Sequence, residues 1–165
     1  MYTKLFWIDG LWRGKLAISA RPRGGDWLED EMRAWRRAGI DAVVSLLTGS
    51  EDQDLGLETE RRESEANGVE FFSLPIVDRS TPASEIGVAL LLNRLDRRLR
   101  EGKNVVIHCR QGIGRSSLIS AALLVEAGMA PAEAFAIISR ARGVPVPETP
   151  EQVAWLDSFA AALKK

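Results

Sequence analysis

The chain has 165 residues, of which 45% are hydrophobic and 27% are charged, and its formal net charge is −1. This balance predicts one globular domain over residues 1–165 and excludes the strong basic field of many nucleic-acid-binding proteins. No apolar run approaches the roughly 18 residues of a membrane span, and the early acid at Asp9 is unlike a signal peptide. With one cysteine, Cys109, no internal disulfide forms, so we expect a cytoplasmic location.

Short apolar stretches alternate with helical patterns along the first half of the chain. Two strands are predicted first, at residues 4–8 and 11–18, joined at Asp9-Gly10, a dipeptide typical of hairpin turns. Asp26 and Glu29 then predict a capping box at the start of a helix that ends at position 39. After it the sequence predicts, in order, a strand at 40–47, an acidic loop at 48–56, a charged helix at 57–67 and a strand at 69–74.

The second half begins with a loop at residues 75–82 and becomes mostly helical. Thr81 is the predicted N-cap of a helix that starts at Pro82 and runs to Arg100. Its predicted buried face consists of Ile86, Leu90, Leu91, Leu95 and Leu99. A buried strand at 105–107 and helices at 115–127, 131–142 and 150–163 follow.

This alternation of strands and helices predicts an α/β fold with a mixed, mainly parallel central sheet flanked by helices. In such sheets the ligand site lies outside the carboxyl ends of the strands. We therefore expect the loops after residues 47, 74 and 108 to converge.

The most informative stretch lies between the strand at 105–107 and the helix that follows. It holds Cys109, Gly112, Gly114 and Arg115. Glycines allow positive φ, so successive backbone N–H groups can turn inward as an anion-binding nest, and the helix adds its positive N-terminal end. Such a cage favours a thiolate and would hold three phosphoryl oxygens against its sulfur. A lone cysteine is usually a small buried hydrophobe, but this complete arrangement indicates a phosphate-cleaving loop, here called the nucleophile loop (residues 109–115).

The order His108, Cys109, five residues, Arg115 and Ser116 matches the signature His-Cys-x5-Arg-Ser/Thr. On this motif the chain resembles the cysteine-dependent protein tyrosine and dual-specificity phosphatases, especially their small single-domain bacterial and archaeal members. The resemblance implies a protein tyrosine phosphatase-like domain in which Cys109 is the nucleophile and Arg115 clamps two phosphoryl oxygens with its planar fork. It also implies a phosphate-binding set of Arg110, Gln111, Gly112, Ile113, Gly114 and Arg115.

Two further residues beside this loop acquire roles from the resemblance. Ser116 would donate its hydroxyl to the sulfur as the intermediate hydrolyses, or be an ordinary residue of the first helical turn. His108 would orient the loop through hydrogen bonds, or be a polar residue at a strand end. As the only histidine, with neither a second imidazole nor a cluster of thiolates to join it, His108 gives no metal site. We therefore expect no metal and no organic cofactor.

A thiolate that attacks a phosphomonoester needs an acid to protonate the leaving oxygen. Asp78 follows the strand at 69–74 in a proline-flanked loop (residues 75–82, here called the acid loop), which resembles the general-acid loop of the family. The alternative for Asp78 is a turn residue that accepts bonds from local backbone N–H groups. The competing carboxylates, Glu51, Asp52 and Asp54, are expected to form a solvated acidic face that repels phosphate.

Gln152 has two interpretations, which the sequence leaves open. With Thr149 it forms a capping box for the last helix, while the resemblance implies a glutamine that positions the hydrolytic water. Four arginines are candidates for the pocket rim or for solvated surface residues: Arg21, Arg23, Arg79 and Arg142. The tryptophans are predicted to be packing residues rather than a ligand cage: Trp7, Trp12, Trp27, Trp35 and Trp155.

Together these features predict hydrolysis of phosphotyrosine in proteins, extending to phosphoserine and phosphothreonine, through a cysteinyl-phosphate with Asp78 as acid and then base. One alternative is a phosphoinositide, inositol phosphate or RNA triphosphate phosphatase, although such enzymes tend to line the loop with more basic residues than Arg110, Gln111 and Ile113 provide. Another is a catalytically silent phospho-binding module. We expect a phosphorylated protein as the partner, no nucleic acid, no membrane, and a monomer.

Overall fold

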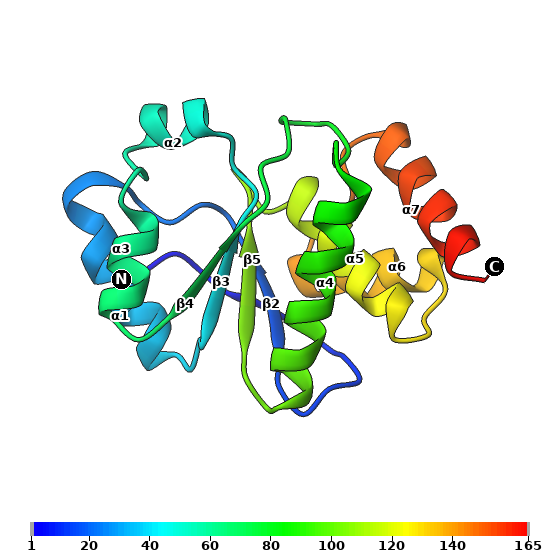
Figure 1. The fold of residues 1–165 in the computed structure, drawn as a ribbon, viewed down its shortest axis with the longest axis horizontal. Helices are drawn as coiled ribbons and strands as arrows, with labels where there is room; N and C mark the ends of the chain where they lie inside the picture. The colour runs from blue at the N-terminus through cyan, green and yellow to red at the C-terminus, as the bar shows by residue number, and fades with distance from the viewer. Residues whose placement is uncertain (1, 165) are drawn as a thin grey trace.

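A central sheet organises the fold. The computed structural model describes residues 2–164, in which five strands form one sheet in the order β1-β2-β5-β3-β4 (Figure 1). Strands β2, β5, β3 and β4 run parallel, and β1 runs antiparallel to β2. The mixed, mainly parallel sheet predicted from the sequence is confirmed. The strands are β1 (Phe6–Ile8), β2 (Leu16–Ser19), β3 (Ala42–Ser45), β4 (Glu70–Ser73) and β5 (Val105–His108).

Helices cover both faces of this sheet. In Figure 1, α1 and α3 lie on one side of the strands and α4 to α7 lie on the other, while α2 stands beyond the carboxyl end of β3. No helix within residues 2–164 is both long and apolar enough to cross a bilayer. The helices are α1 (Leu28–Arg37), α2 (Gly49–Leu55), α3 (Glu60–Ala66), α4 (Glu85–Arg100), α5 (Arg115–Glu126), α6 (Pro131–Arg142) and α7 (Pro150–Leu163).

The central strand β5 divides the core between these two layers. Val106 packs with Trp35 of α1 in one hydrophobic cluster, whereas Val105 and Ile107 belong to the cluster formed with α4 and α5. A parallel strand that is covered on both faces needs apolar residues at successive positions. This explains why residues 105–107 form an uninterrupted apolar run, and it fixes β5 in the middle of the sheet.

The N-terminal connections differ from the sequence-based prediction. Residues 9–15 join β1 to β2, so Asp9-Gly10 does not form a tight hairpin turn. Trp12 in this link donates from Nε1 to Asp96 Oδ1 at 2.9 Å, a contact to α4 that a two-residue turn could not make.

The start of α1 also differs from the prediction. The prediction of a capping box between Asp26 and Glu29 is wrong, because a 3₁₀ turn (Gly25–Trp27) precedes α1 and no side chain caps either element. Glu29 instead accepts a hydrogen bond from Arg33 Nη2 at 2.6 Å, one helical turn along α1.

The buried face of α4 is also placed differently. Ser84 rather than Thr81 is its N-cap, accepting from Gly87 N. The predicted core residues Ile86 and Leu90 are 75% and 60% exposed. The buried positions are Val88, Leu91, Leu92, Leu95 and Leu99. Because α4 has apolar residues at helical spacing on two overlapping stripes, only its packing against the sheet decides which stripe is buried.

The tryptophans and the later helices give a mixed result. Trp35 is fully buried as predicted, but Trp7 and Trp27 are exposed, so the prediction that all five are packing residues is wrong for these two. Helices α6 and α7 begin and end where the sequence predicts, and α5 ends one residue earlier. Apolar periodicity combined with Pro at the first helical position is a local signal, which explains its accuracy here.

Candidate active site

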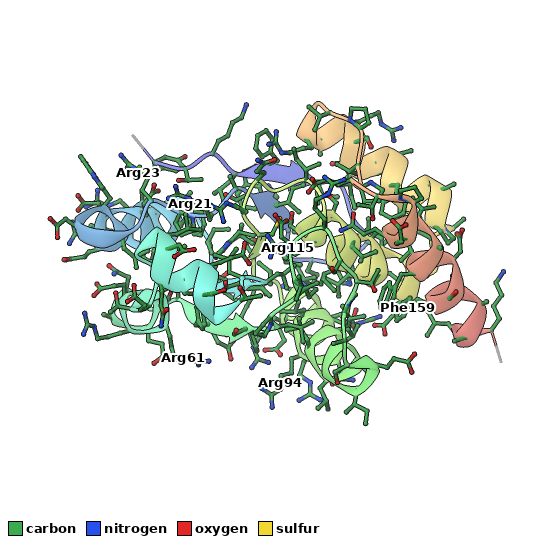
Figure 2. The ribbon with its side chains drawn as sticks, turned by 90° about the horizontal axis from the view of Figure 1, so that it is seen from above. Arg21, Arg23, Arg61, Arg94, Arg115 and Phe159 are labelled. Atoms are coloured by element: carbon green, nitrogen blue, oxygen red, sulfur yellow. The ribbon has the colours of Figure 1, made fainter. Side chains whose placement is uncertain are left out.

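Three loops meet at the carboxyl edge of the sheet, as the topology requires. The nucleophile loop connects β5 to α5, the loop after β3 leads into α2, and the acid loop follows β4. Arg115 is their common point: it contacts Glu51 of α2 and both Ile76 and Asp78 of the acid loop. Figure 2 shows Arg115 near the centre of the molecule. The predicted convergence of these loops is confirmed.

Cys109 lies at the base of this junction. Its side chain is 2% exposed, and its Sγ atom lies 3.3 Å from Ser116 Oγ. Gly114 is the N-cap residue of α5, where no side chain accepts from the first-turn N–H groups. Those N–H groups and the helix dipole therefore remain available to an anion in front of the sulfur. This local geometry suits a nucleophilic thiolate attacking a bound phosphoryl group.

The peptide planes of the nucleophile loop are oriented by donors outside it. Arg21 N donates to the carbonyl of Arg110 at 3.2 Å, and Arg142 donates to the carbonyls of Gln111 and Gly112, each at 3.1 Å. Carbonyls held outward leave the adjoining N–H groups free to point inward, which is the requirement for an anion nest. Arg142, a predicted rim candidate, braces the loop through these carbonyl contacts.

Gly112 is required by this packing. Its φ is +71°, and a Cβ at this position would lie 2.6 Å from the backbone carbon of Ser19. A side chain would therefore clash with β2 and strain the backbone at once. The loop obtains its shape from glycine at this position.

The guanidinium of Arg115 is buried, and both of its Nη atoms have protein partners. Nη1 donates to Glu51 Oε1 at 2.7 Å and to the Ile76 carbonyl at 2.8 Å, while Nη2 lies 3.0 Å from Glu51 Oε2 and 3.1 Å from Asp78 Oδ1. Burial alone would raise the pKa of Glu51, but the hydrogen bonds from Arg115 and from Thr48 N outweigh it and lower that pKa. Arg115 is thus held by a carboxylate that is ionised at neutral pH.

This contact corrects two predictions about the stretch after β3. Residues 49–55 form helix α2 rather than a loop, with a capping box between Thr48 and Glu51. Glu51 is not part of a solvated face that repels phosphate, because it is buried and neutralised by Arg115. Asp54 is exposed as predicted. The carboxylate of Glu51 fixes the orientation of the very cation that would bind phosphate.

Asp78 stands at the mouth of the same junction. Its side chain is 51% exposed, and among residues 2–164 it forms an ion pair with Arg115 alone. It lies in a turn in which Ser80 N donates to the Val77 carbonyl at 2.9 Å. Asp78 therefore lies in a turn, but in the described part of the chain its carboxylate accepts no hydrogen bond from a local backbone N–H and reaches the guanidinium of Arg115 instead. These two properties are compatible with an acid that faces a bound phosphate ester.

His108 belongs to a buried network behind the nucleophile loop. Its Nε2 lies 2.7 Å from Glu60 Oε2, and its Nδ1 lies 3.3 Å from the Cys109 carbonyl. Burial lowers the pKa of His108, but the charge and hydrogen bond of Glu60 outweigh it and raise that pKa overall. Burial and the nearby charge of Glu60 raise the pKa of Asp52 to about 6. His108 is more than a polar strand end, since it links Glu60 to the Cys109 backbone.

Gln152 connects the acid loop to the start of α7. The predicted capping box with Thr149 is present, and the side chain is fully buried. Its Oε1 accepts from Glu148 N at 3.0 Å and from Thr149 N at 3.2 Å, while Nε2 donates to the Ser80 carbonyl at 3.2 Å. Gln152 therefore caps a helix and contacts the acid loop, with its amide 3.2 Å from where a Gly114 Cβ would lie.

Comparison with known proteins identifies the family. A family model described as "Polymorphic toxin system, DSP-PTPase phosphatase" matches residues 18–129, more than half of the chain, including Asp78, Cys109 and Arg115. The chain belongs to this DSP-PTPase phosphatase family. It is a cysteine-based phosphatase, as the signature predicts. No curated protein sequence matches the chain significantly.

Solved structures share the fold of this phosphatase along nearly its whole length. Tk-PTP in its active form has a TM-score of 0.78 and 32% identity, with 95% of this chain and 96% of that chain covered. Kinase associated phosphatase with its catalytic cysteine changed to serine has a TM-score of 0.89 and 20% identity, with coverages of 99% and 97%. PTPMT1 in complex with PI(5)P has a TM-score of 0.76 and 21% identity, with coverages of 96% and 97%. One of these neighbours is named for its association with a kinase and another is bound to PI(5)P, so the shared fold leaves the substrate class of this phosphatase undetermined.

Three carboxylates of the phosphatase site were missed or misjudged from the sequence. Glu51 holds Arg115, Glu60 holds His108, and Glu148 approaches Gly114 closely enough to clash with any Cβ there. The spacing of Thr48 and Glu51 contains a capping box that would have predicted α2. No local signal indicates which arginine or histidine each carboxylate meets. Within residues 2–164, no three His, Cys, Asp or Glu side chains are grouped so that they could hold a metal ion.

Proposed function

We propose that this phosphatase hydrolyses phosphomonoesters in proteins, with phosphotyrosine as its main substrate and with phosphoserine and phosphothreonine as further substrates. One observation carries the proposal: Cys109, the open N-terminus of α5, Arg115 and Asp78 all border one junction, with Asp78 3.1 Å from the guanidinium. A nucleophile, an anion cage and an acid are the three components that phosphate-ester cleavage by a thiolate requires.

In the first proposed step the Cys109 thiolate attacks phosphorus and the ester oxygen leaves with a proton from Asp78. The nucleophile-loop amides and Arg115 hold the equatorial oxygens, where negative charge accumulates. In the second step Asp78, now ionised, accepts a proton from water as the water oxygen attacks phosphorus. The sulfur departs as a thiolate, assisted by the hydroxyl of Ser116, and inorganic phosphate is released.

Phosphate binding must change the contacts of Arg115. Both Nη atoms already have protein partners, so a phosphoryl oxygen can bind Nη2 only if Asp78 leaves it. The phosphoryl oxygen thereby replaces the Asp78 carboxylate as the partner of Nη2, which leaves Asp78 free to face the leaving oxygen.

The charge around the loop supports a substrate with one phosphoryl group over a headgroup with several. Arg110 is the cation of the nucleophile loop besides Arg115, and its Nη1 lies 3.8 Å from Glu51 Oε2 with the side chain 45% exposed. A headgroup with several phosphates needs more than one extra cation that is free of carboxylates. The loop therefore supports recognition of a single phosphoryl group.

The substrate test compares kcat/KM for phosphotyrosine peptides, phosphoserine and phosphothreonine peptides, and phosphoinositides in vesicles, with chelator present. We expect phosphotyrosine peptides to be preferred by about tenfold or more and Cys109→Ser to lack turnover on all of them. Cys109→Ser should still bind inorganic phosphate, because the amide cage and Arg115 persist. A tenfold preference for phosphoinositides would overturn the substrate assignment, and full activity in Cys109→Ser would overturn the mechanism.

The acid is tested by leaving-group dependence. Asp78→Asn should slow phenyl phosphate by about 10²–10⁴-fold, and should slow p-nitrophenyl phosphate much less because its phenolate leaves without a proton. Asp54→Asn is the matched control, since Asp54 is an exposed acid on α2. If Asp54→Asn reproduces the leaving-group dependence and Asp78→Asn does not, the acid is misassigned.

A further inference from the structure

The turn that carries Asp78 has an unusual backbone. Arg79 follows Asp78 with φ of +63°, and among residues 2–164 it is the one non-glycine residue with positive φ. This left-handed conformation costs free energy for any residue with a Cβ. Such conformations persist where surrounding contacts hold them, and they concentrate at functional sites. The turn at Arg79 therefore depends on contacts with neighbouring segments.

Few apolar contacts anchor the turn itself. Val77 and Asp78 are exposed, whereas Ile76 is 2% exposed and fixes the chain on the strand side of the turn. On the other side the tethers are polar and come from the link between α6 and α7 and from the first turn of α7. Gln152 donates to the Ser80 carbonyl at 3.2 Å, and Arg79 Nη1 pairs with Glu148 Oε2 at 3.0 Å.

Glu148 contacts both loops of the site. Its Oε2 binds Arg79, and its Oε1 lies 2.6 Å from where a Cβ on Gly114 would be placed. The carboxylate thus rests against the nucleophile loop while it holds the residue next to Asp78. The Glu148 N–H is in turn bound by Gln152 Oε1 at 3.0 Å, which keeps the carboxylate beside α7. This places a single side chain between the proposed acid and the phosphate cage.

We propose that the Arg79–Glu148 ion pair positions Asp78 for proton transfer to the leaving oxygen. Arg79 and Glu148 are then positioning residues of the reaction, acting through Asp78 rather than on the substrate. This inference rests on the proposed function, in which Asp78 is the acid. Without the pair, the strained turn relaxes and Asp78 spends less time facing the phosphate, so the step that needs its proton slows while phosphate binding is unchanged.

The test uses variants that remove the pair while leaving the turn possible. Arg79→Asn removes the guanidinium but tolerates positive φ better than most residues, and Glu148→Gln keeps the shape of the carboxylate without its charge. Because the side chains are 61% and 22% exposed, solvent weakens the pair. We expect kcat for phenyl phosphate to fall about 3- to 5-fold in each variant, with KM unchanged and with p-nitrophenyl phosphate affected less than about 1.5-fold. Arg79→Lys should recover part of the rate.

The double variant and a change of salt concentration test whether Arg79 and Glu148 act through the same contact. Arg79→Asn combined with Glu148→Gln should be no slower than either single variant, because both remove the same contact. High salt should slow the wild type on phenyl phosphate toward the variants and leave the variants unchanged. Glu29→Gln is the control, since it breaks an exposed 2.6 Å pair with Arg33 on α1, and it should leave every rate unchanged.

Three outcomes overturn the inference. Equal slowing of both esters, or additive losses in the double variant, would show that the residues act on stability or binding and not through Asp78. Unchanged rates in all variants would make the pair an ordinary surface contact. The inference fails separately from the proposed function: if Asp78→Asn shows the leaving-group dependence and the Arg79 and Glu148 variants do not, the acid stands and the positioning role is wrong.

Discussion

Replacing Glu51 by glutamine tests the part of the site that the sequence misjudged. Glu51 binds Arg115 through two hydrogen bonds, at 2.7 Å and 3.0 Å, in a buried position. Glutamine at the third helical position still serves in a capping box, so α2 keeps its start. Glu51→Gln therefore removes the charge opposite Arg115 and one of its two acceptors, and little else.

The expected loss of stability follows from the contacts that remain. Removing one partner of a buried ion pair costs about 3–5 kcal/mol. Here the Gln oxygen retains one hydrogen bond, and the Ile76 carbonyl and Asp78 still face the guanidinium, so we expect about 2–3 kcal/mol. For a chain of this size each kcal/mol lowers the melting temperature by about 2–4 °C, which gives a fall of about 4–12 °C.

The rate should fall as well, because an arginine without its carboxylate samples orientations that do not match a phosphoryl group. We expect kcat/KM for p-nitrophenyl phosphate to drop about 10- to 100-fold. Thermal unfolding and steady-state kinetics are the assays, with the exposed Asp54→Asn on the same helix as control. If Glu51→Gln melts within about 1 °C of the wild type and its kcat/KM is within twofold, the reasoning about Arg115 is refuted.

The pH dependence of this stability difference has a definite sign. The pKa of Glu51 is lowered in the folded state from its ordinary value of 4.5. A lowered folded pKa gives stability that is present above the unfolded pKa and is lost as the pH falls through the folded one. The stability gap between wild type and Glu51→Gln should therefore be constant from neutral pH down to about 5 and shrink below that.

Three further variants test other contacts of the site. Gly112→Ala should lower kcat/KM by about 100-fold or more because of its positive φ and its clash with Ser19, whereas Gly128→Ala, also at positive φ but with no neighbour within 4 Å, should leave the kinetics unchanged. Arg115→Lys should lose both phosphate affinity, measured by calorimetry, and turnover, because an ammonium cannot make the forked contact. Glu60→Gln should destabilise the protein by about 2–4 kcal/mol. Because Glu60 raises the pKa of His108, the loss of stability should be full below pH 6.5 and should shrink as the pH rises through the raised pKa. Chemical denaturation at several pH values measures this dependence.

The chemistry of the nucleophile loop follows from its local sequence. The glycines, the cysteine and the arginine of the nucleophile loop all lie within seven residues, between a buried strand and a helix. Backbone conformation over so short a range follows from residue type, so this loop could be predicted from the sequence. The same holds for α6 and α7, whose proline starts and apolar periodicity are local. The mainly parallel sheet followed from the alternation of elements, and with it the convergence of the loops at one edge.

The tertiary structure alone decided which distant groups meet in that site. Glu51 and Arg115 are 64 positions apart, and Glu60 and His108 are 48 apart, so nothing in the local pattern of either segment specifies the pairing. An acidic stretch such as 48–56 is compatible with a solvated surface or with a buried counter-ion, and the difference depends on the packing of α2 over the end of β3. Packing against the sheet likewise determines which apolar stripe of α4 is buried and which is exposed. Capping and periodicity are energies within one segment, whereas burial and ion pairing are energies between segments, and only the folded chain fixes the second kind.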